Sequence, residues 1–129
     1  MTVKIAKMMA PALALLSVAM AGAPALAGDD MVGKRVFLQR CAMCHAAEPD
    51  KKSPVGPSLA GVVGRAPAAV PGYAYSPALR AEKAAWTAKR LDAFLAEPTK
   101  VVPGTRMTYP VADAKQREDI LAYLATTGR

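Results

Sequence analysis

The sequence predicts a small all-α domain with long loops, and three observations support this. Several segments place apolar residues at the three- and four-residue spacing of a helix. No segment alternates apolar and polar residues for long enough to predict a strand. Between residues 49 and 77, and again between 98 and 111, prolines and glycines interrupt every regular pattern. Such loops bury little on their own, so they indicate a domain that wraps a large apolar ligand.

The first 27 residues differ from the rest of the chain and are typical of a secretory signal peptide. Two lysines precede an apolar run that ends in Ala25-Leu26-Ala27. A basic start, an apolar middle and a small-x-small end form the pattern of a cleavable signal. The run is also long enough to span a bilayer, so an uncleaved membrane anchor is the alternative. We expect a cleavable signal peptide over residues 1–27 and a single domain over residues 28–129.

The predicted domain keeps a positive charge balance. Removing the two lysines of the signal segment leaves 15 Lys and Arg residues against 10 Asp and Glu residues, or +5. This excess favours an acidic partner or an anionic surface, although it also serves solubility. The basic residues are scattered, without interleaved aromatic residues, which argues against nucleic-acid binding. With only seven aromatic side chains, so small a domain would gain stability from a group to fold around.

The first helix is predicted from about residue 30 to residue 41. Asp29 and Asp30 stand where a helix start favours acidic residues, and Phe37 follows at helical spacing. A short helical patch is expected over residues 58–63, inside the long loop. The first helix therefore leads directly into the cysteines of the chain.

Two more helices are predicted in the second half. Thr87 has the chemistry of an N-cap for a helix over residues 87–96, which Pro98 would stop. The last helix is expected from residue 113 to about residue 126. Its apolar side is formed by Ile120, Leu121, Tyr123 and Leu124, and Gly128 lies beyond its end.

All the cysteine and histidine of the chain lies in the window Cys41-Ala42-Met43-Cys44-His45. A disulfide within one turn would restrain little chain, and a thioredoxin-like pair would need strands alternating with helices. A zinc site would need a fourth nitrogen or sulfur ligand. Covalent attachment of c-type haem accounts for every residue, because two thiols add to the vinyl groups of one porphyrin and His45 faces the iron. The window therefore predicts haem c.

The single histidine leaves a methionine, a lysine, a tyrosine, water or nothing for the other face of the iron. Met31 lies near the amino end of the domain, and Met43 lies inside the attachment turn. Met107 lies in a loop stiffened by Pro103 and Pro110. A thioether is a soft ligand that favours reduced iron and raises the reduction potential. Met107 is therefore the predicted second iron ligand, with core filling as the alternative.

The chain resembles the class I cytochromes c, close to the mitochondrial and bacterial cytochrome c2 type, over nearly all of residues 28–129. The motifs are, in order, Gly33 and Phe37 ahead of CAMCH, then GPSLAGVVGR, PGYAYS, Trp86, FLAEP, VPGTRM and REDILAYL. The resemblance implies the all-α class I cytochrome c fold, with helices and long loops wrapped around one covalently bound haem. It also implies that the first and last helices cross, with Gly33 and Phe37 near Tyr123.

The resemblance further implies roles for five residues. The backbone carbonyl of Pro57 is expected to accept the N–H of His45, which fixes the tautomer of the imidazole. The expected contacts of the haem propionates are Arg65, Tyr75, Trp86 and Thr105. Buried carboxylates need charge and hydrogen-bond donors to stay ionised, which suits these side chains. The alternatives are core filling for Trp86 and a solvated loop cation for Arg65.

The chain departs from the family pattern in three places. Phe94 stands where many relatives carry a tyrosine whose hydroxyl reaches the methionine sulfur. The segment after Met107 is one residue shorter than in the relatives compared. Thr99 stands where a lysine is common, which leaves Lys100 and Arg106 as the basic residues on that side. These differences are expected to alter the reduction potential, the strength of the Met107 bond and the field that attracts a partner.

The resemblance implies a periplasmic monohaem carrier of single electrons in a respiratory or photosynthetic chain, and no enzyme. Its partners would be a quinol-oxidising complex, a terminal oxidase, a reaction centre or a periplasmic dehydrogenase, met briefly by a monomer. No nucleic acid and, after signal cleavage, no stable membrane insertion are expected. The alternatives are a haem enzyme or gas sensor with an open iron site, and a subunit lodged in a larger enzyme.

Overall fold

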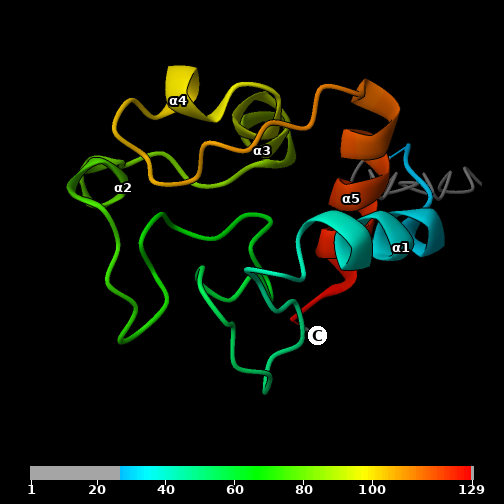
Figure 1. The fold of residues 1–129 in the computed structure, drawn as a ribbon, viewed down its shortest axis with the longest axis horizontal. Coiled ribbons are helices and arrows are strands. Elements are labelled where there is room, and N and C mark those ends of the chain that lie inside the picture. The colour runs from blue at the N-terminus through cyan, green and yellow to red at the C-terminus, as the bar shows by residue number, and fades with distance from the viewer. Residues whose placement is uncertain (1–26, 129) are drawn as a thin grey trace, which may run out of the picture.

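The computed structural model describes residues 27–128, and within them the chain forms five helices (Figure 1). The helices are α1 (Asp30–Arg40), α2 (Pro77–Ala81), α3 (Ala88–Ala96), α4 (Pro98–Val101) and α5 (Ala114–Thr126). Residues 27–128 contain no strand, so the all-α prediction is confirmed. None of the helices in this range is long and apolar enough to cross a membrane. Residues 1–26 of the predicted signal peptide lie outside the described part.

Three helices begin where the sequence predicts, each with a side-chain cap. For the first helix, Asp29 Oδ1 accepts the N–H groups of Met31 (2.9 Å) and Val32 (3.0 Å). For the other two, Thr87 Oγ1 accepts the N–H of Arg90 (3.2 Å), and Asp113 Oδ1 accepts the N–H of Gln116 (2.9 Å). A cap of this kind typically contributes about 1 kcal/mol of helix stability. The predictions for α1, α3 and α5 are therefore confirmed to within one residue at each end.

The predicted helical patch over residues 58–63 is wrong, because this stretch forms turns. Gly61 and Gly64 adopt φ angles of +65° and +86°. These left-handed conformations are open to glycine and end any right-handed helix.

The prediction that Pro98 ends helical structure is also incomplete. Pro98 is the first residue of the short helix α4, a position where proline loses no hydrogen bond. Pro77 likewise opens α2, which the sequence did not predict, and Ser76 Oγ caps it by accepting the N–H of Leu79 at 3.1 Å. Prolines read as loop residues therefore start two short helices.

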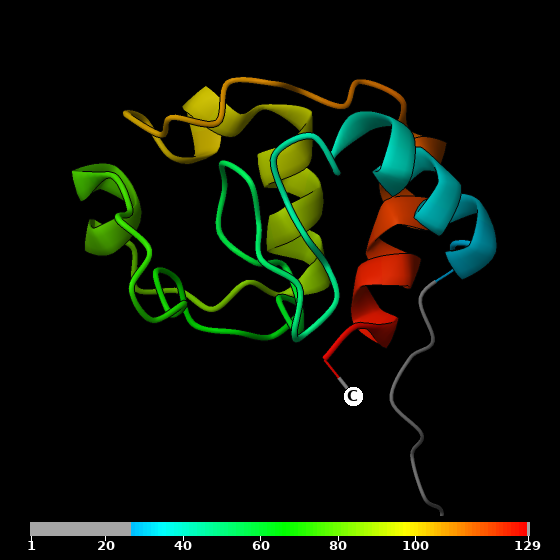
Figure 2. The same cartoon turned by 60° about the horizontal axis from the view of Figure 1, so that its bottom comes forward.

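Helices α1 and α5 cross on one side of the molecule (Figures 1 and 2). Their backbones touch at Gly33, where an added Cβ would lie 1.8 Å from the carbonyl oxygen of Asp119. Next to this contact the rings of Phe37 and Tyr123 pack with centroids 5.4 Å apart. The predicted crossing of the first and last helices is therefore confirmed, with Gly33 and Phe37 at Tyr123.

A buried carboxylate ties the start of α1 to α5. The side chain of Asp119 is 5% exposed, and its Oδ1 accepts the backbone N–H of Asp29 at 2.8 Å and pairs with Lys115. The Lys115 hydrogen bond, together with the Asp29 N–H, lowers the pKa of Asp119 below its ordinary value. We refer to the α1–α5 contact with this cluster as the helix corner.

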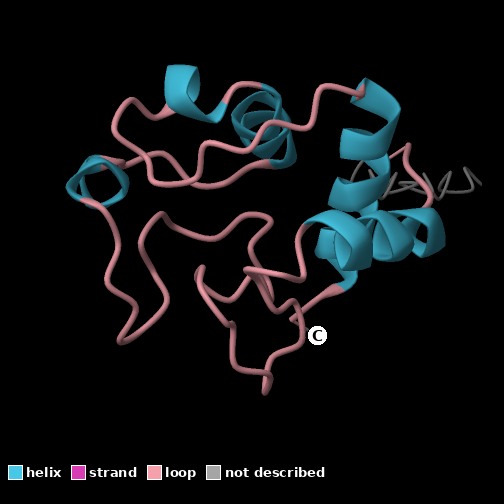
Figure 3. Ribbon diagram, in the orientation of Figure 1, coloured by secondary structure: helices cyan, strands magenta, loops and turns pink. Residues whose placement is uncertain are grey.

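The remainder of the described chain is mostly loop, as Figure 3 shows. We call residues 41–76 and 102–113 the loop half. Backbone hydrogen bonds join its loops, such as Leu59 N–H to Ala46 O (2.8 Å), and a bond from Trp86 N–H to Arg65 O (2.8 Å) joins it to the segment before α3. The loops and α3 enclose a space that the protein's own side chains leave open, which is described next.

Candidate haem site

The loop half, α3 and the helix corner together surround a cavity of about 990 Å³, counted with its opening to solvent. Its wall is almost entirely apolar, with leucine, valine, phenylalanine, tyrosine and tryptophan side chains. Eight of the nine predicted site residues line it, namely Cys41, His45, Pro57, Arg65, Tyr75, Trp86, Thr105 and Met107. Cys44, the ninth, is half-buried and is not part of the lining.

The attachment turn continues directly from α1. Cys41 N–H still bonds to Phe37 O at 2.7 Å, and the N–H groups of Cys44 and His45 both bond to Cys41 O, at 3.0 and 2.9 Å. These bonds bring His45 from the end of a helix to the wall of the cavity. The carbonyl of Cys44 then accepts the N–H of Gly56 at 2.7 Å, which fastens the turn to the next loop.

The two thiols are free and are not joined in a disulfide. Burial raises the pKa of Cys41 to about 11, with Arg40 opposing the shift. The unattached Cys41 is therefore a neutral thiol at neutral pH. Cys41 lies on the cavity wall, where it would attach a haem that fills the cavity.

His45 is oriented by its neighbour in the long loop. Its Nδ1 lies 2.8 Å from the carbonyl oxygen of Pro57. Because a carbonyl oxygen can only accept a hydrogen bond, Nδ1 is assigned the hydrogen and acts as the donor. Burial lowers the pKa of the imidazole, with the Pro57 bond opposing. A neutral ring with Nδ1 protonated leaves the Nε2 lone pair available, which is the state that a metal requires.

Gly56 closes the space behind the imidazole. A Cβ at this position would lie 2.2 Å from His45 Cε1 and 2.6 Å from its Nδ1. Real Cβ atoms do not approach this closely, so any larger residue would displace the ring. The Gly56-Pro57 pair therefore both shapes and orients the histidine.

Met107 reaches the cavity from the loop between α4 and α5. Its backbone N–H bonds to Thr105 Oγ1 at 3.3 Å, and its side chain packs against the core. The neighbouring Arg106 donates to the carbonyl of Ala74 at 2.8 Å, which links this loop to the loop before α2. Met107 and His45 thus line the same cavity from loops far apart in sequence.

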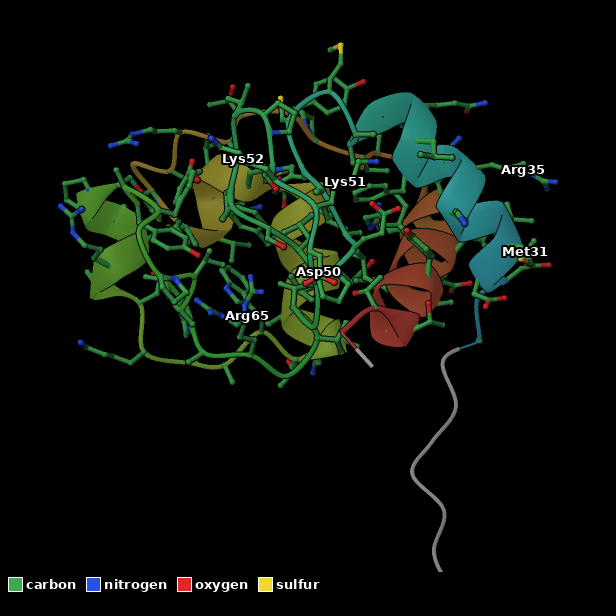
Figure 4. All side chains as sticks on the ribbon, turned by 90° about the horizontal axis from the view of Figure 1, so that it is seen from below. Met31, Arg35, Asp50, Lys51, Lys52 and Arg65 are labelled. Carbon is green, nitrogen blue, oxygen red and sulfur yellow. The ribbon has the colours of Figure 1, made fainter. Side chains whose placement is uncertain are left out.

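Arg65 is a half-buried cation whose Nε has no partner. Its Nη1 and Nη2 donate to the carbonyls of Ala60 (2.8 Å) and Ser58 (2.9 Å), while the buried Nε has no partner. Burial lowers the pKa of the guanidinium, against an opposing influence of Tyr75. In Figure 4 Arg65 lies near the centre of the view, whereas Arg35 projects outward from α1. Two backbone carbonyls therefore hold the Arg65 guanidinium at the cavity wall.

Three further predicted residues bring hydrogen-bond donors to the cavity wall. The hydroxyl of Tyr75 accepts the N–H of Val70 at 3.1 Å, and the hydroxyl of Thr105 accepts that of Met107, so each keeps its own proton to donate. The Trp86 indole N–H is a donor in a ring that lines the cavity. Together with Arg65, these groups are suited to carboxylates that enter the cavity.

The residues present fit a haem. The apolar wall suits a flat macrocycle, and the Nε2 of His45 and the thioether of Met107 are the nitrogen and soft sulfur donors that would hold its iron. The unpartnered Nε of Arg65 is the kind of buried donor that a propionate would satisfy. A structural zinc site would instead need a cluster of ligands, and residues 27–128 contain no group of three or more His, Cys, Asp or Glu residues placed for a metal.

The family model for cytochrome c matches residues 31–128. The chain belongs to the cytochrome c family. This cytochrome c is 44% identical over 100 residues to cytochrome c2 of Rhodopila globiformis, a match that covers 77% of this chain and 93% of the relative. It is 41% identical to the solved structure of cytochrome cH from Methylobacterium extorquens, with a TM-score of 0.71 over 78% of this chain and all of that one.

A third relative is longer than the shared domain. The match to cytochrome c-type cyt cy of Rhodobacter capsulatus is 41% identical over 105 residues and covers 81% of this chain. It covers only 52% of the relative, so this chain spans about half the length of that protein. The relationship there concerns the cytochrome domain.

Membership in the family establishes the cofactor and the general role. The protein carries haem c with its iron, bound covalently, and Cys41 and Cys44 stand in the attachment motif. It is a monohaem electron carrier that works with redox proteins, and it is not an enzyme. Both conclusions agree with the expectations from the sequence.

The structure also reveals cavity residues that the sequence did not single out. Tyr73 lines the cavity and donates its hydroxyl to Val55 O at 3.2 Å, and its ring meets Tyr75 edge-on at 4.7 Å. Arg106, which the sequence suggested only as a basic surface residue, joins two loops, and Gly56 packs against His45. The only local signals for these two roles were the neighbouring residues Met107 and Pro57, because the contacts themselves are made with other loops.

Proposed function

We propose that this cytochrome c is a periplasmic one-electron carrier whose iron is held by His45 and Met107. The observation that carries the proposal is that these two side chains line one cavity, with His45 Nδ1 already occupied by Pro57 O at 2.8 Å. The haem supplies a ferric–ferrous couple that takes up and releases one electron. The Cys41 and Cys44 thiols attach the haem, and no substrate has to enter.

The chain's own residues then keep rearrangement small. His45 is fixed by Pro57 and Gly56, and the loop of Met107 is fastened to Ala74 through Arg106. Arg65, Tyr75, Trp86 and Thr105 bind the propionates through the donors that they keep free. Because each group is held before the electron arrives, little reorganisation accompanies the transfer.

The surface beside the cysteines favours a brief contact with a redox partner. Met43 is 83% exposed and Val55 67%, and they lie close together because Val55 N–H bonds to Cys44 O at 3.1 Å. On the side of the Met107 loop, Lys100 is paired with Glu97, so its charge is partly cancelled. A mixed apolar and weakly basic surface suits a short-lived complex with a quinol-oxidising complex, an oxidase, a reaction centre or a dehydrogenase.

The location is supported by the sequence of residues 1–27, read as a signal peptide that is removed to leave a periplasmic monomer. The mass of the purified haem protein from its native membrane and periplasmic fractions tests this. A soluble protein that begins at Gly28 is expected. A membrane-bound protein that retains the apolar segment would favour the anchor instead.

The iron ligands are tested by the variant Met107→Leu, with Met43→Leu as the exposed control. The parent and the control are expected to show a ferric charge-transfer band in the red and no carbon monoxide binding when reduced. Met107→Leu should lose the band, bind the gas promptly and lower the equilibrium constant for reduction at least a hundredfold, about 120 mV. Rapid gas binding by the parent would contradict the proposal and favour a sensor or enzyme with an open site.

A further inference from the structure

Arg90 of α3 lies against the ring of Trp86. Its guanidinium carbon is 4.4 Å from the ring centroid, which is the distance of a cation–π contact. Nη1 donates to the carbonyl of Ala84 at 2.6 Å, and Nη2 pairs with the carboxylate of Glu82. The Arg90 and Glu82 side chains are only 19% and 26% exposed. Three separate contacts thus fix the plane of the guanidinium.

The backbone and the ring of Trp86 are both held in place by neighbouring residues. The residue is 6% exposed, and its ring packs on Phe94 with centroids 5.1 Å apart. Its backbone N–H donates to Arg65 O at 2.8 Å, and its carbonyl accepts the N–H of Gly64 at 2.7 Å. The indole ring lines the cavity, so its N–H is a donor for a group that enters there. The orientation of the ring therefore decides where this one donor points.

We propose that Arg90 is a positioning residue for Trp86, which it holds so that the indole N–H donates to a carboxylate of the haem. Glu82 balances the charge of Arg90, so the effect comes from orientation and not from added positive charge. The inference rests on the proposed role of Trp86 as a propionate contact. A donor to the propionate offsets negative charge that would otherwise favour ferric iron, so Arg90 raises the reduction potential through Trp86.

The shape of arginine is essential to this role. A guanidinium is planar and can stack on a ring while its edges donate to two acceptors. A lysine keeps the charge and can pair with Glu82, but its ammonium cannot reproduce the stack and both hydrogen bonds together. Arg90→Lys therefore separates orientation from charge, which Arg90→Met does not.

The experiment uses the haem-loaded protein and the variants Arg90→Lys, Arg90→Met and Lys89→Met. Lys89 is exposed and lies next to Arg90 on α3. Because Lys89→Met removes one positive charge, as Arg90→Met does, it is the matched control. Spectroelectrochemistry gives the reduction potential. Because Trp86 is the only tryptophan of the chain, NMR gives a single indole N–H signal whose solvent exchange can be followed.

Both Arg90 variants are expected to lower the equilibrium constant for reduction threefold or more and to speed indole proton exchange tenfold or more. The control should change neither. Parental values of both quantities in Arg90→Lys would overturn the proposal. So would a lower potential in Arg90→Met alone with unchanged indole exchange, because Arg90 would then act only through its charge.

Trp86→Phe separates this inference from the function proposed above. If Trp86→Phe keeps the parental potential, Trp86 is no propionate donor, and the basis of the inference fails with it. If Trp86→Phe lowers the potential while Arg90→Lys does not, the role of Trp86 stands and the positioning role of Arg90 alone is wrong.

Discussion

The helix corner and the loop half of this cytochrome c are held together in different ways. In the corner, protein packs on protein: Gly33 lets α1 touch the backbone of α5, Phe37 meets Tyr123, and Asp119 closes the start of α1. In the loop half, apolar side chains face a cavity of about 990 Å³, and backbone bonds join one loop to the next. The first region is held by direct helix–helix packing, although its Phe37, Ile120 and Leu124 also line the cavity, whereas the second is built around the haem.

This difference shows how so small a chain can fold with so few large aromatic residues. A domain of this length gains limited stability from its own apolar side chains. In the helix corner, the close approach of the α1 and α5 backbones gives tight packing without large side chains. The loop half uses the haem as its largest apolar group, so its order and its function depend on the same molecule.

The largest expected effect comes from preventing haem attachment with the double variant Cys41→Ala/Cys44→Ala. Without haem, the side chains around the cavity lose their packing partner, which removes most of the stability of the loop half. Hydrogen exchange should show loss of protection at least a hundredfold greater in residues 44–76 than in α1 and α5. Equal losses in both regions would mean that the corner has no stability of its own.

Gly33→Ala breaks the comparison from the other side. The new Cβ would lie 1.8 Å from the carbonyl oxygen of Asp119, so α1 must move away from α5. We expect the free energy of unfolding to fall by about 3 kcal/mol, at the upper end for overpacked cores. Denaturant titration of the haem protein measures this, and Lys34→Ala on the exposed face of α1 is the control. A loss below about 0.5 kcal/mol would show that α1 is not held by this contact.

A smaller effect is expected from Asp119→Asn, and it depends on pH. The pKa of Asp119 is lowered in the folded protein, chiefly by the Lys115 hydrogen bond, so the carboxylate stabilises the fold above its unfolded pKa of about 3.9. This stability is lost as the pH falls through the folded pKa. The variant should therefore be less stable than the parent at neutral pH and approach it in acid.

Denaturant titrations between about pH 7 and pH 2 measure this difference, which should shrink steadily below the unfolded pKa of about 3.9. Asp113→Asn, which keeps a capping side chain at the start of α5, is the control for a general charge effect. A difference between Asp119→Asn and the parent that stays constant over this range would show that the carboxylate does not act through its charge.

The sequence predicted the helices of the corner and the covalently bound haem, for reasons that are local. Caps such as Asp29 and Thr87, helical spacing, and a cysteine window next to one histidine each act within a few residues. The same reasoning failed over residues 58–63, where the left-handed glycines Gly61 and Gly64 decide the backbone. Apolar spacing alone does not show that a turn is fixed by glycine.

What the sequence could not give are contacts between loops. Arg106 bonds to Ala74 and Gly56 packs on His45, and no periodic pattern marks either of these pairs. The two residues of each pair are brought together because the loops fold around the cavity. Such contacts can be predicted only when the path of the loops is known, and that path depends on the haem that the loops enclose.

The single tryptophan gives this protein a built-in optical reporter. Trp86 lines the cavity that holds the haem, and a haem at such close range quenches indole fluorescence by energy transfer. The tryptophan fluorescence is therefore weak while α3 and the loop before it enclose the haem, and its intensity rises when they move away from the haem. One fluorescence trace therefore follows the separation of α3 and the loop before it from the haem, without any added dye and independently of the helix signal from α1 and α5.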